Sequence, residues 1–272
     1  MDPIRAVFER LRRSRRKALM PFIMGGDPDL PTTGELLRVL ADSGADLIEV
    51  GVPFSDPLAD GPTIQRASGR ALARGTTPEA VLESVHRAAA RVPAPILLLS
   101  YWNPIVQYGR GRSRGADGAA FLHDARAAGC SGVIVPDLPV EEGQGFRQAA
   151  LRAGLAPIFL AAPTSPPERL RRIARCSEGL IYYVSVTGTT GARRCLSHEW
   201  VDGVRQLKLI TTKPVCVGFG ISTPSQAASV ARAADGVIVG SALIRTMEPY
   251  LRRRRALRQA VSSFMRRLRR AV

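Results

Sequence analysis

Eight short runs of apolar residues recur along the chain, each with the length and β-branched content of a buried strand. They occupy residues 18–26, 45–54, 94–102, 131–139, 156–163, 179–186, 214–221 and 235–243. Segments with apolar residues at helical spacing separate them, and several begin at Ser or Thr and end at Gly. Strands that are apolar throughout and alternate with helices indicate a parallel sheet covered by helices. Eight such units predict a (β/α)8 barrel, since an open sheet of this class usually has about five or six strands.

Two further helices are expected outside the eight repeats. One precedes the first strand at about residues 2–14, and a long arginine-rich helix follows the last strand at about residues 251–270. An apolar stripe marks the buried face of this last helix: Leu251, Leu257, Val261, Phe264 and Leu268. We expect one domain over residues 1–272, with the barrel at about 18–250 and a loop insertion at 108–118.

The net charge of +16 is concentrated at the two ends of the chain. Residues 1–17 hold seven basic and two acidic residues, and residues 251–272 hold nine arginines and no acidic residue. Such ends could bind a polyanion such as nucleic acid. A solvated helix face, in a chain with 36 arginines and only three lysines, is the simpler interpretation and the one we favour.

Composition and motif spacing exclude several other classes. The four cysteines have no paired spacing and the three histidines are scattered, so neither a metal site nor a disulfide framework is predicted. No apolar stretch has the length of a membrane span. The N-terminus alternates charged and apolar residues, unlike a signal peptide, and we expect a cytoplasmic protein.

An isolated glutamate, Glu49, ends the second apolar run, and the loop after it contains Asp56 and Asp60. Charged side chains are rarely buried without a partner or a function. In (β/α)8 enzymes the active site lies at the carboxyl ends of the strands, where Glu49 is expected. The alternatives are an ion pair for Glu49, although its nearest arginine, Arg38, is on the preceding helix, and a simple Asp-Gly turn for Asp60.

Three glycine-containing loops follow the last three predicted strands, at residues 185–193, 218–223 and 239–244. Barrels of this kind often hold a phosphate group in the loops after strands seven and eight. Glycine lets backbone N–H groups approach the phosphate oxygens. Each loop alone is compatible with an ordinary turn, but together they predict a phosphate site. Because the loops contain no lysine, we expect recognition by backbone amides and the Ser241 hydroxyl.

These segments closely resemble one family, the tryptophan synthase alpha subunit. The resemblance is carried by the strand ends, in chain order PFIMGGDPD, IEVGVPFSDPLADGPTIQRA, SYWNPIVQYG, GVIVPDLPVEE, APIFLAAPTS, YYVSVTGTTGAR, GFGIS and VIVGSALI. It covers most of the chain, and the second segment is the most specific. The resemblance implies a barrel enzyme that cleaves indole-3-glycerol phosphate into indole and glyceraldehyde 3-phosphate, a retro-aldol reaction.

In the family the catalytic pair corresponds here to Glu49 and Asp60. Protonation of indole C3 must precede cleavage, because indole is a poor leaving carbanion. We assign Glu49 as the acid at C3 and the base at the glycerol hydroxyl, with a pKa raised by apolar surroundings. Asp60, expected to stay ionised, would accept a hydrogen bond from the indole N–H.

The resemblance also implies binding residues. For the substrate they are Phe22, Leu99, Tyr101, Leu160, Tyr182, Thr190 and Phe219, the apolar ones around the indole, the Tyr182 hydroxyl near the glycerol part, and Thr190 closing over the substrate and orienting Asp60. For the phosphate they are Gly191, Gly220, Ile221, Gly240 and Ser241. Plain core packing is the alternative for the aromatic and aliphatic members.

The resemblance implies a beta subunit that carries pyridoxal phosphate, in an α2β2 heterotetramer, with no cofactor and no metal in the present chain. Contacts with that partner are expected at Pro53, Asp56, Pro57, Asn103 and Pro104. Departures from the family pattern are Thr189 where valine is usual, Cys195 nearby, a longer 108–118 segment and an extended C-terminus. There are two competing hypotheses. One is a free-standing lyase that releases indole without a partner, and the other is a polyanion-binding protein whose barrel has lost its enzymatic activity.

Overall fold

The computed structural model describes residues 2–109, 117–184, 199–218 and 220–272. Its strands, all parallel, are β1 (Ala18–Met24), β2 (Ile48–Gly51), β3 (Ile96–Leu99), β4 (Cys130–Ile134), β5 (Ala156–Ile158), β6 (Leu160–Ala161), β7 (Ile181–Val184), β8 (Val215–Gly218) and β9 (Gly236–Val239). They form one sheet in the order β5-β4-β3-β2-β1-β9-β8-β7-β6.

The fifth predicted strand closes the barrel. It is split into β5 and β6 at Phe159, and β5 pairs with β4 whereas β6 pairs with β7. One continuous segment therefore joins the two edges of the sheet. The predicted (β/α)8 barrel is confirmed, with the nine strands of the described chain representing eight repeats.

The strands are shorter than the apolar runs that predicted them. The run at 94–102, for example, contains a strand only at Ile96–Leu99, and the helix α5 already begins at Trp102. Apolar residues continue past the strand because the loops at its carboxyl end are themselves packed into the molecule. Burial, on which the prediction rested, therefore extends beyond the hydrogen-bonded part of each strand.

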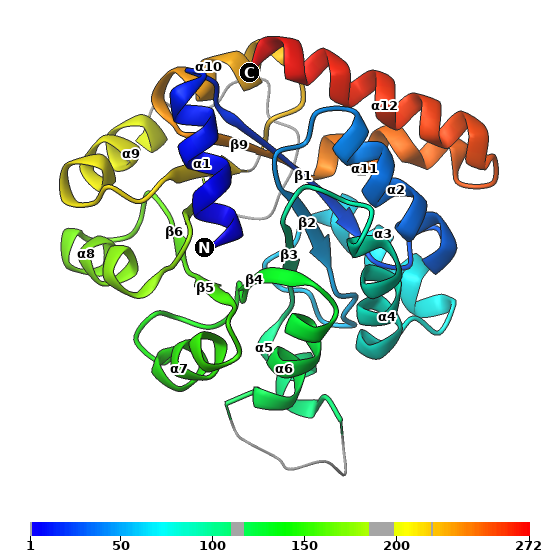
Figure 1. Ribbon diagram of the computed structural model, residues 1–272, viewed down its shortest axis with the longest axis horizontal. Coiled ribbons are helices and arrows are strands. Elements are labelled where there is room, and N and C mark those ends of the chain that lie inside the picture. Colours follow the sequence, from blue (N-terminus) through cyan, green and yellow to red (C-terminus); the bar gives the residue numbers. More distant parts are fainter. Residues whose placement is uncertain (1, 110–116, 185–198, 219) are drawn as a thin grey trace.

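Helices surround the strands (Figure 1). They are α1 (Pro3–Arg13), α2 (Leu30–Asp42), α3 (Pro62–Ala73), α4 (Pro78–Ala89), α5 (Trp102–Gln107), α6 (Ala119–Ala127), α7 (Gln144–Arg152), α8 (Pro167–Cys176), α9 (Glu199–Ile210), α10 (Pro224–Ala233), α11 (Ser241–Met247) and α12 (Arg254–Ala271), with a 3-10 turn at Glu248–Tyr250. Side-chain caps begin several of them, such as Asp29, which accepts a hydrogen bond of 2.7 Å from the backbone N–H of Thr32. Residues 110–116, most of the expected insertion, lie outside the described part of the chain.

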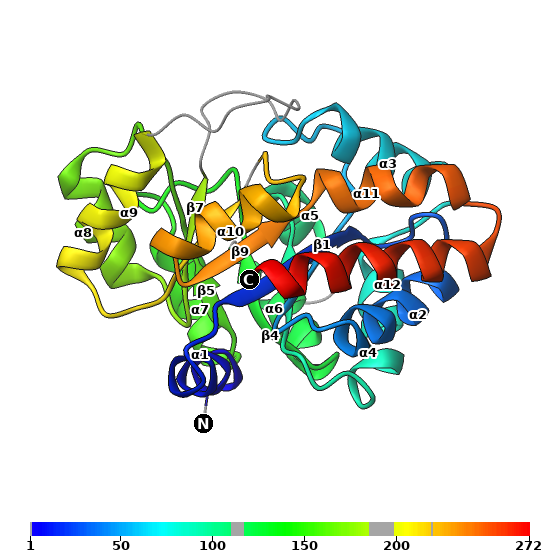
Figure 2. The same ribbon diagram turned by 90° about the horizontal axis from the view of Figure 1, so that it is seen from above.

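The helix α1 covers the amino-terminal end of the barrel. Its buried residues Ile4, Val7, Phe8 and Leu11 join one apolar cluster with inward-facing strand residues. Figure 2 shows α1 at one end of the barrel and the segment leading into α3 at the other. Because this end is filled by α1, a ligand can enter the barrel interior only from the carboxyl ends of the strands.

The terminal helix α12 uses its apolar stripe as predicted at four positions, with Leu257, Val261, Phe264 and Leu268 buried. Leu251 precedes the helix, and Met265 joins the stripe instead. The charged face is partly paired: Arg254 lies 3.2 Å from Asp29, Arg258 lies 3.0 Å from Glu35, and Arg269 lies 2.6 Å from Asp46. These ion pairs attach α12 to the barrel and its helices and favour the structural interpretation of the basic terminus.

Over the described ranges, no helix combines the length and the apolar character that crossing a bilayer requires.

Candidate active site

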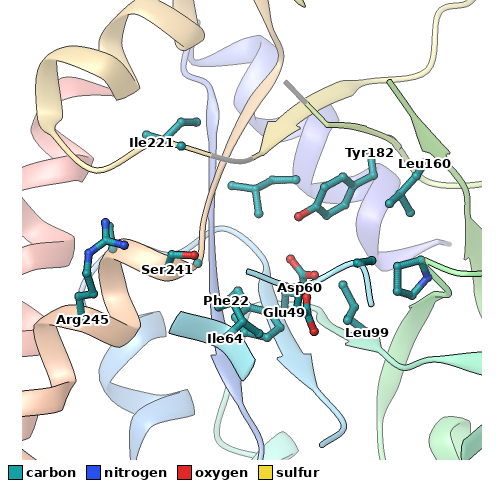
Figure 3. A pocket seen from close by; sticks show the side chains of 16 residues that line it. Phe22, Glu49, Asp60, Ile64, Leu99, Leu160, Tyr182, Ile221, Ser241 and Arg245 are labelled. Atoms are coloured by element: carbon teal, nitrogen blue, oxygen red, sulfur yellow. The ribbon is translucent and has the colours of Figure 1, made fainter. Parts of the chain in front are cut away.

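A cavity that is partly open to solvent lies at the carboxyl ends of the strands, with about 860 Å³ of empty space when the adjoining open solvent is included. Its walls come from β1, β2, β3, β6, β7 and β9, from the loops after β2, β4, β8 and β9, and from α3 and α11 (Figure 3). The lining residues are Phe22, Glu49, Ala59, Asp60, Ile64, Leu99, Pro136, Leu160, Tyr182, Gly220, Ile221, Ile238, Gly240, Ser241, Ala242 and Arg245. Ten of the predicted site residues are thereby brought together.

Strand alternation places Glu49 inside the barrel. Its neighbours Ile48 and Val50 pack in the core between the strands and the outer helices, so Glu49 points the opposite way. In the sheet register Glu49 lies beside Phe22 on one side and Leu97 on the other. An acidic side chain is thus held between two apolar neighbours.

The carboxyl group of Glu49 is fully buried and has no hydrogen-bond partner among the described residues. Burial raises the pKa of Glu49 to about 8, and the nearby charge of Asp60 acts in the same direction. Glu49 therefore carries its proton near neutral pH and can act as an acid. The ion pair to an arginine, the alternative from the sequence, is absent from the described chain.

Asp60 lies in the loop between β2 and α3, and its carboxyl group lies close to that of Glu49 (Figure 3). Burial raises the pKa of Asp60 to about 6, while a hydrogen bond with the Tyr101 hydroxyl opposes that rise. Asp60 is thus more readily ionised than Glu49. Two carboxyl groups with separated pKa values can act at neutral pH as one acid and one acceptor.

Tyr101 was predicted to bind substrate, but it is not among the residues that line the cavity. Its hydroxyl accepts a hydrogen bond of 2.9 Å from the backbone N–H of Ala59 and also interacts with Asp60. Its ring contacts Phe54, with 5.4 Å between ring centroids. Tyr101 therefore contacts the loop that carries Asp60 from outside the cavity wall and holds it in place.

The apolar wall of the cavity is formed by predicted residues. Figure 3 shows the ring of Tyr182 and the side chains of Leu160, Leu99 and Phe22 around the two carboxyl groups. A glycine at position 51 makes room for Phe22, because a Cβ there would lie 2.7 Å from the ring. The pKa of Tyr182 is raised by burial and by the charges of Glu49 and Asp60, so its hydroxyl stays protonated and can donate a hydrogen bond.

The predicted phosphate residues Gly220, Ile221, Gly240 and Ser241 lie together at one side of the cavity. Gly220 adopts a φ of 75°, a left-handed conformation that suits glycine and exposes the backbone. Thr190, Gly191 and Phe219 lie outside the described residues.

Sequence reasoning missed six lining residues: Ala59, Ile64, Pro136, Ile238, Ala242 and Arg245. Five are small or apolar and carry no chemical signal in the sequence. Arg245 differs, because it follows Ser241 by four positions and such spacing places two side chains on the same face of a helix. That spacing was visible in the sequence.

Of the residues predicted to contact a partner, Asp56 and Asn103 are exposed, and Pro57 and Pro104 are partly exposed. Pro53 is buried, because the loop enters the molecule there, so it offers little surface to a partner. Leu58, which was not predicted, is 86% exposed in the same loop.

The described residues contain no group of three or more His, Cys, Asp or Glu side chains that could hold a metal ion. Beside the apolar wall of the cavity, Glu49 can transfer a proton to and from a bound ligand, and Asp60 can accept a hydrogen bond from it. A polar corner with glycine backbone and a hydroxyl is suited to an anionic group on the same ligand.

Comparison with known proteins gives the family. A family model described as "Tryptophan synthase alpha chain" matches residues 8–272. The tryptophan synthase alpha chain of Geobacter sulfurreducens is 48% identical over 272 residues, which cover 100% of this chain and 99% of the relative. That of Gloeobacter violaceus is 53% identical over 245 residues, covering 90% and 86%.

Solved structures agree. The chain resembles tryptophan synthase subunit alpha from Legionella pneumophila with a TM-score of 0.88 and 38% identity, over 100% of this chain and 98% of that one. It also resembles a chain of the aminoacrylate-bound tryptophan synthase from M. tuberculosis, with a TM-score of 0.86 and 35% identity over all of both chains. On this evidence the chain belongs to the tryptophan synthase alpha chain family.

Proposed function

We propose that the cavity cleaves indole-3-glycerol phosphate, with Glu49 and Asp60 as the catalytic pair. Family membership makes the chain a lyase component of tryptophan synthase that works with a beta subunit. The observation that carries the residue assignment is the fully buried carboxyl group of Glu49 at the wall of an apolar cavity, without a hydrogen-bond partner in the part of the chain that the structure describes. Such a group is costly for stability and is retained where its proton is used.

The reaction starts with proton transfer from Glu49 to C3 of the indole ring. This gives a cationic ring, and Asp60, as a carboxylate, accepts a hydrogen bond from the indole N–H and stabilises the charge. The ionised Glu49 then takes the proton of the hydroxyl on the adjacent glycerol carbon. As that oxygen forms a carbonyl, the carbon–carbon bond breaks and its electron pair returns to the ring, which releases indole and glyceraldehyde 3-phosphate with Glu49 protonated again.

The remaining residues bind and orient the substrate. Phe22, Leu99 and Leu160 cover the indole, and the Tyr182 hydroxyl donates a hydrogen bond to the glycerol part. Gly220, Ile221, Gly240 and Ser241 hold the phosphate. Gly191 at the phosphate, Phe219 at the indole and Thr190 over the substrate lie outside the described residues and are assigned from the sequence alone. Glu49 makes both proton transfers, so the proposal places no cofactor here and assigns pyridoxal phosphate to the beta subunit.

The loop between β2 and α3 is proposed as part of the surface that meets the beta subunit in an α2β2 heterotetramer. It exposes Asp56 and Leu58 on its outer side and carries Asp60 on its inner side. The Ser68 hydroxyl donates to the backbone carbonyl of Phe54 (2.8 Å) and accepts from its N–H (2.9 Å), which fixes the start of the loop to α3. Binding of a partner to this loop would therefore act on the position of Asp60.

The test is indole release from indole-3-glycerol phosphate by the wild type, Asp60→Asn and Asp202→Asn. Asp202 makes its ion pair at the surface, 72% exposed, and serves as the matched control. We expect kcat/KM to rise with pH as Asp60 ionises near pH 6 and to fall as Glu49 ionises near pH 8. Asp60→Asn should lose about 10²- to 10³-fold in kcat/KM, whereas Asp202→Asn should match the wild type.

Full activity of Asp60→Asn would exclude the assigned role of that carboxylate. Adding a beta subunit separates the proposal from a free-standing lyase. A subunit should release indole faster with its partner present, and an unchanged rate would favour the free-standing enzyme.

A further inference from the structure

Arg245 stands out among the residues of the cavity wall. It is partly buried on α11, one helical turn after Ser241, and both line the same cavity. In the described part of the chain, no hydrogen bond or ion pair engages its guanidinium group, whereas Arg66, Arg70 and Arg269 all have carboxylate partners. A guanidinium group that faces a cavity and has no carboxylate partner is available to an anionic group of a ligand.

The acidic side chain nearest to Arg245 along the chain, Glu248, is already engaged. Glu248 lies 3.0 Å from Arg66 and 3.6 Å from Arg70, and Arg70 also forms a two-point contact with the buried Asp27 at 2.7 and 2.8 Å. This network holds Glu248 toward α3. Among the described residues, Arg245 is therefore left at the cavity without an anionic partner.

The position of Arg245 in the cavity defines the kind of anion that it can meet. In the view of Figure 3 the order across the site is Arg245, Ser241, and then Glu49 and Asp60. The cation is thus at the end that also presents the Ser241 hydroxyl and the backbone of Gly220 and Gly240. The carboxyl groups lie at the other end, so the two ends of the cavity differ in charge.

We propose that Arg245 is the charged ligand of the substrate's phosphate group. The inference rests on the proposed function and extends it, because backbone amides and one hydroxyl supply partial charges only, whereas the phosphate of the substrate carries a charge of about −1.5 to −2 at neutral pH. A guanidinium group neutralises part of that charge and can bind two phosphate oxygens at once. It also makes the site select phosphorylated over dephosphorylated substrate.

The contact is made far from the bond that breaks, so it binds the ground state and the transition state equally. Its removal should therefore raise KM rather than lower kcat. The test compares Arg245→Met and Arg245→Lys with Arg255→Met, which removes the same charge from an exposed position on α12. We expect KM to rise about 10- to 30-fold in Arg245→Met and about threefold in Arg245→Lys, and to stay at the wild-type value in Arg255→Met.

Ionic strength supplies a readout that a structural role of Arg245 would not move. The KM of the wild type should rise with added sodium chloride more steeply than that of Arg245→Met, because salt screens the charge pair that the variant lacks. The same KM for Arg245→Met and Arg255→Met, or the same salt dependence in the wild type and Arg245→Met, would overturn the inference.

A binding measurement keeps the inference separate from the proposed function. Calorimetric titration with inorganic phosphate needs no turnover, and affinity should fall about tenfold in Arg245→Met but not in Arg255→Met. If the wild type fails to cleave indole-3-glycerol phosphate but shows this pattern, the proposed function is wrong and the phosphate ligand stands. If cleavage is seen and phosphate affinity is equal in all variants, including no binding in any of them, the phosphate ligand is wrong and the proposed function stands.

Discussion

Two buried carboxyl groups, one just before β2 and one within it, have opposite surroundings. Asp46 precedes β2 at the end of the barrel covered by α1, and Glu49 is three residues further on, at the cavity. Asp46 accepts hydrogen bonds from the backbone N–H of Leu19 at 3.0 Å and from Arg269 at 2.6 Å, with Arg10 at 3.6 Å. Glu49 has none among the described residues.

Asp46 and Glu49 therefore serve different purposes although they are close in sequence: Asp46 contributes to stability and Glu49 to function. A buried carboxylate with hydrogen bonds and a counter-ion is a connection between elements, here between β1, β2 and α12. A buried carboxyl group without partners binds its proton more tightly in the folded chain than in the unfolded chain, and its burial lowers stability at neutral pH. The first arrangement supports the fold, whereas the second is tolerated for chemistry.

Glu49→Gln should sharpen this contrast most. Loss of the acid should lower kcat about 10²- to 10⁴-fold, measured as indole release. Stability should change the other way. The pKa of Glu49 is raised from 4.5 to about 8, so the free energy of unfolding of the wild type falls as the pH rises between these values, because folding there requires uptake of a proton.

The glutamine variant lacks this titration, so urea unfolding at pH 5 and pH 8 should show a smaller fall than in the wild type. Asp46→Asn is the control, since it changes the paired carboxyl group three residues before Glu49. A Glu49→Gln protein that retained wild-type kcat would remove Glu49 from the mechanism. Parallel pH dependence in wild type and variant would contradict the burial of an unpartnered acid.

Asp46→Ala tests the other half of the comparison. It leaves the Arg269 guanidinium, whose side chain is 13% exposed, and the Leu19 N–H without their partner. We expect a loss of about 3–5 kcal/mol in the free energy of unfolding, with kcat/KM of the folded enzyme unchanged. The double variant Asp46→Ala/Arg269→Met should recover part of this loss. A loss below about 1 kcal/mol would show that the pair behaves as a surface ion pair.

The fold could be predicted from the sequence because its signal is repeated. Eight apolar runs and the helices between them point to the same architecture, so an error in any one boundary leaves the barrel intact. The split of the fifth run at Phe159 was not visible, because the change of pairing partner from β4 to β7 depends on barrel closure and not on local residues. The start of α12 was placed three residues too early, since Leu251 fits the apolar stripe although the helix begins at Arg254.

The candidate site was predicted unevenly for the same kind of reason. Glu49 and Asp60 are acidic residues in or next to an apolar segment, so their residue type alone marked them as candidate site residues. Tyr101 was expected to face the ligand, yet whether it does so depends on the path of the loop at 52–61, which packs over its hydroxyl. Pro53 likewise is buried by that path. Arg245 could not be told from the many other arginines of the chain, except by its spacing from Ser241. Its place in the cavity wall, with no partner among the described residues, became visible only in the structure.

Tyr101→Phe gives the smallest expected effect and tests how Asp60 is kept ionised. The interaction with the Tyr101 hydroxyl lowers the pKa of Asp60 against the effect of burial, so its removal should raise that pKa above about 6. The rising limb of the profile of kcat/KM against pH should then move to higher pH, while the falling limb, set by Glu49, stays near pH 8. Tyr108→Phe, a tyrosine outside the cavity wall, is the control for loss of a hydroxyl. A rising limb that stays in place, or two limbs that move together, would show that Tyr101 acts only on the position of the loop, through its hydrogen bond with Ala59.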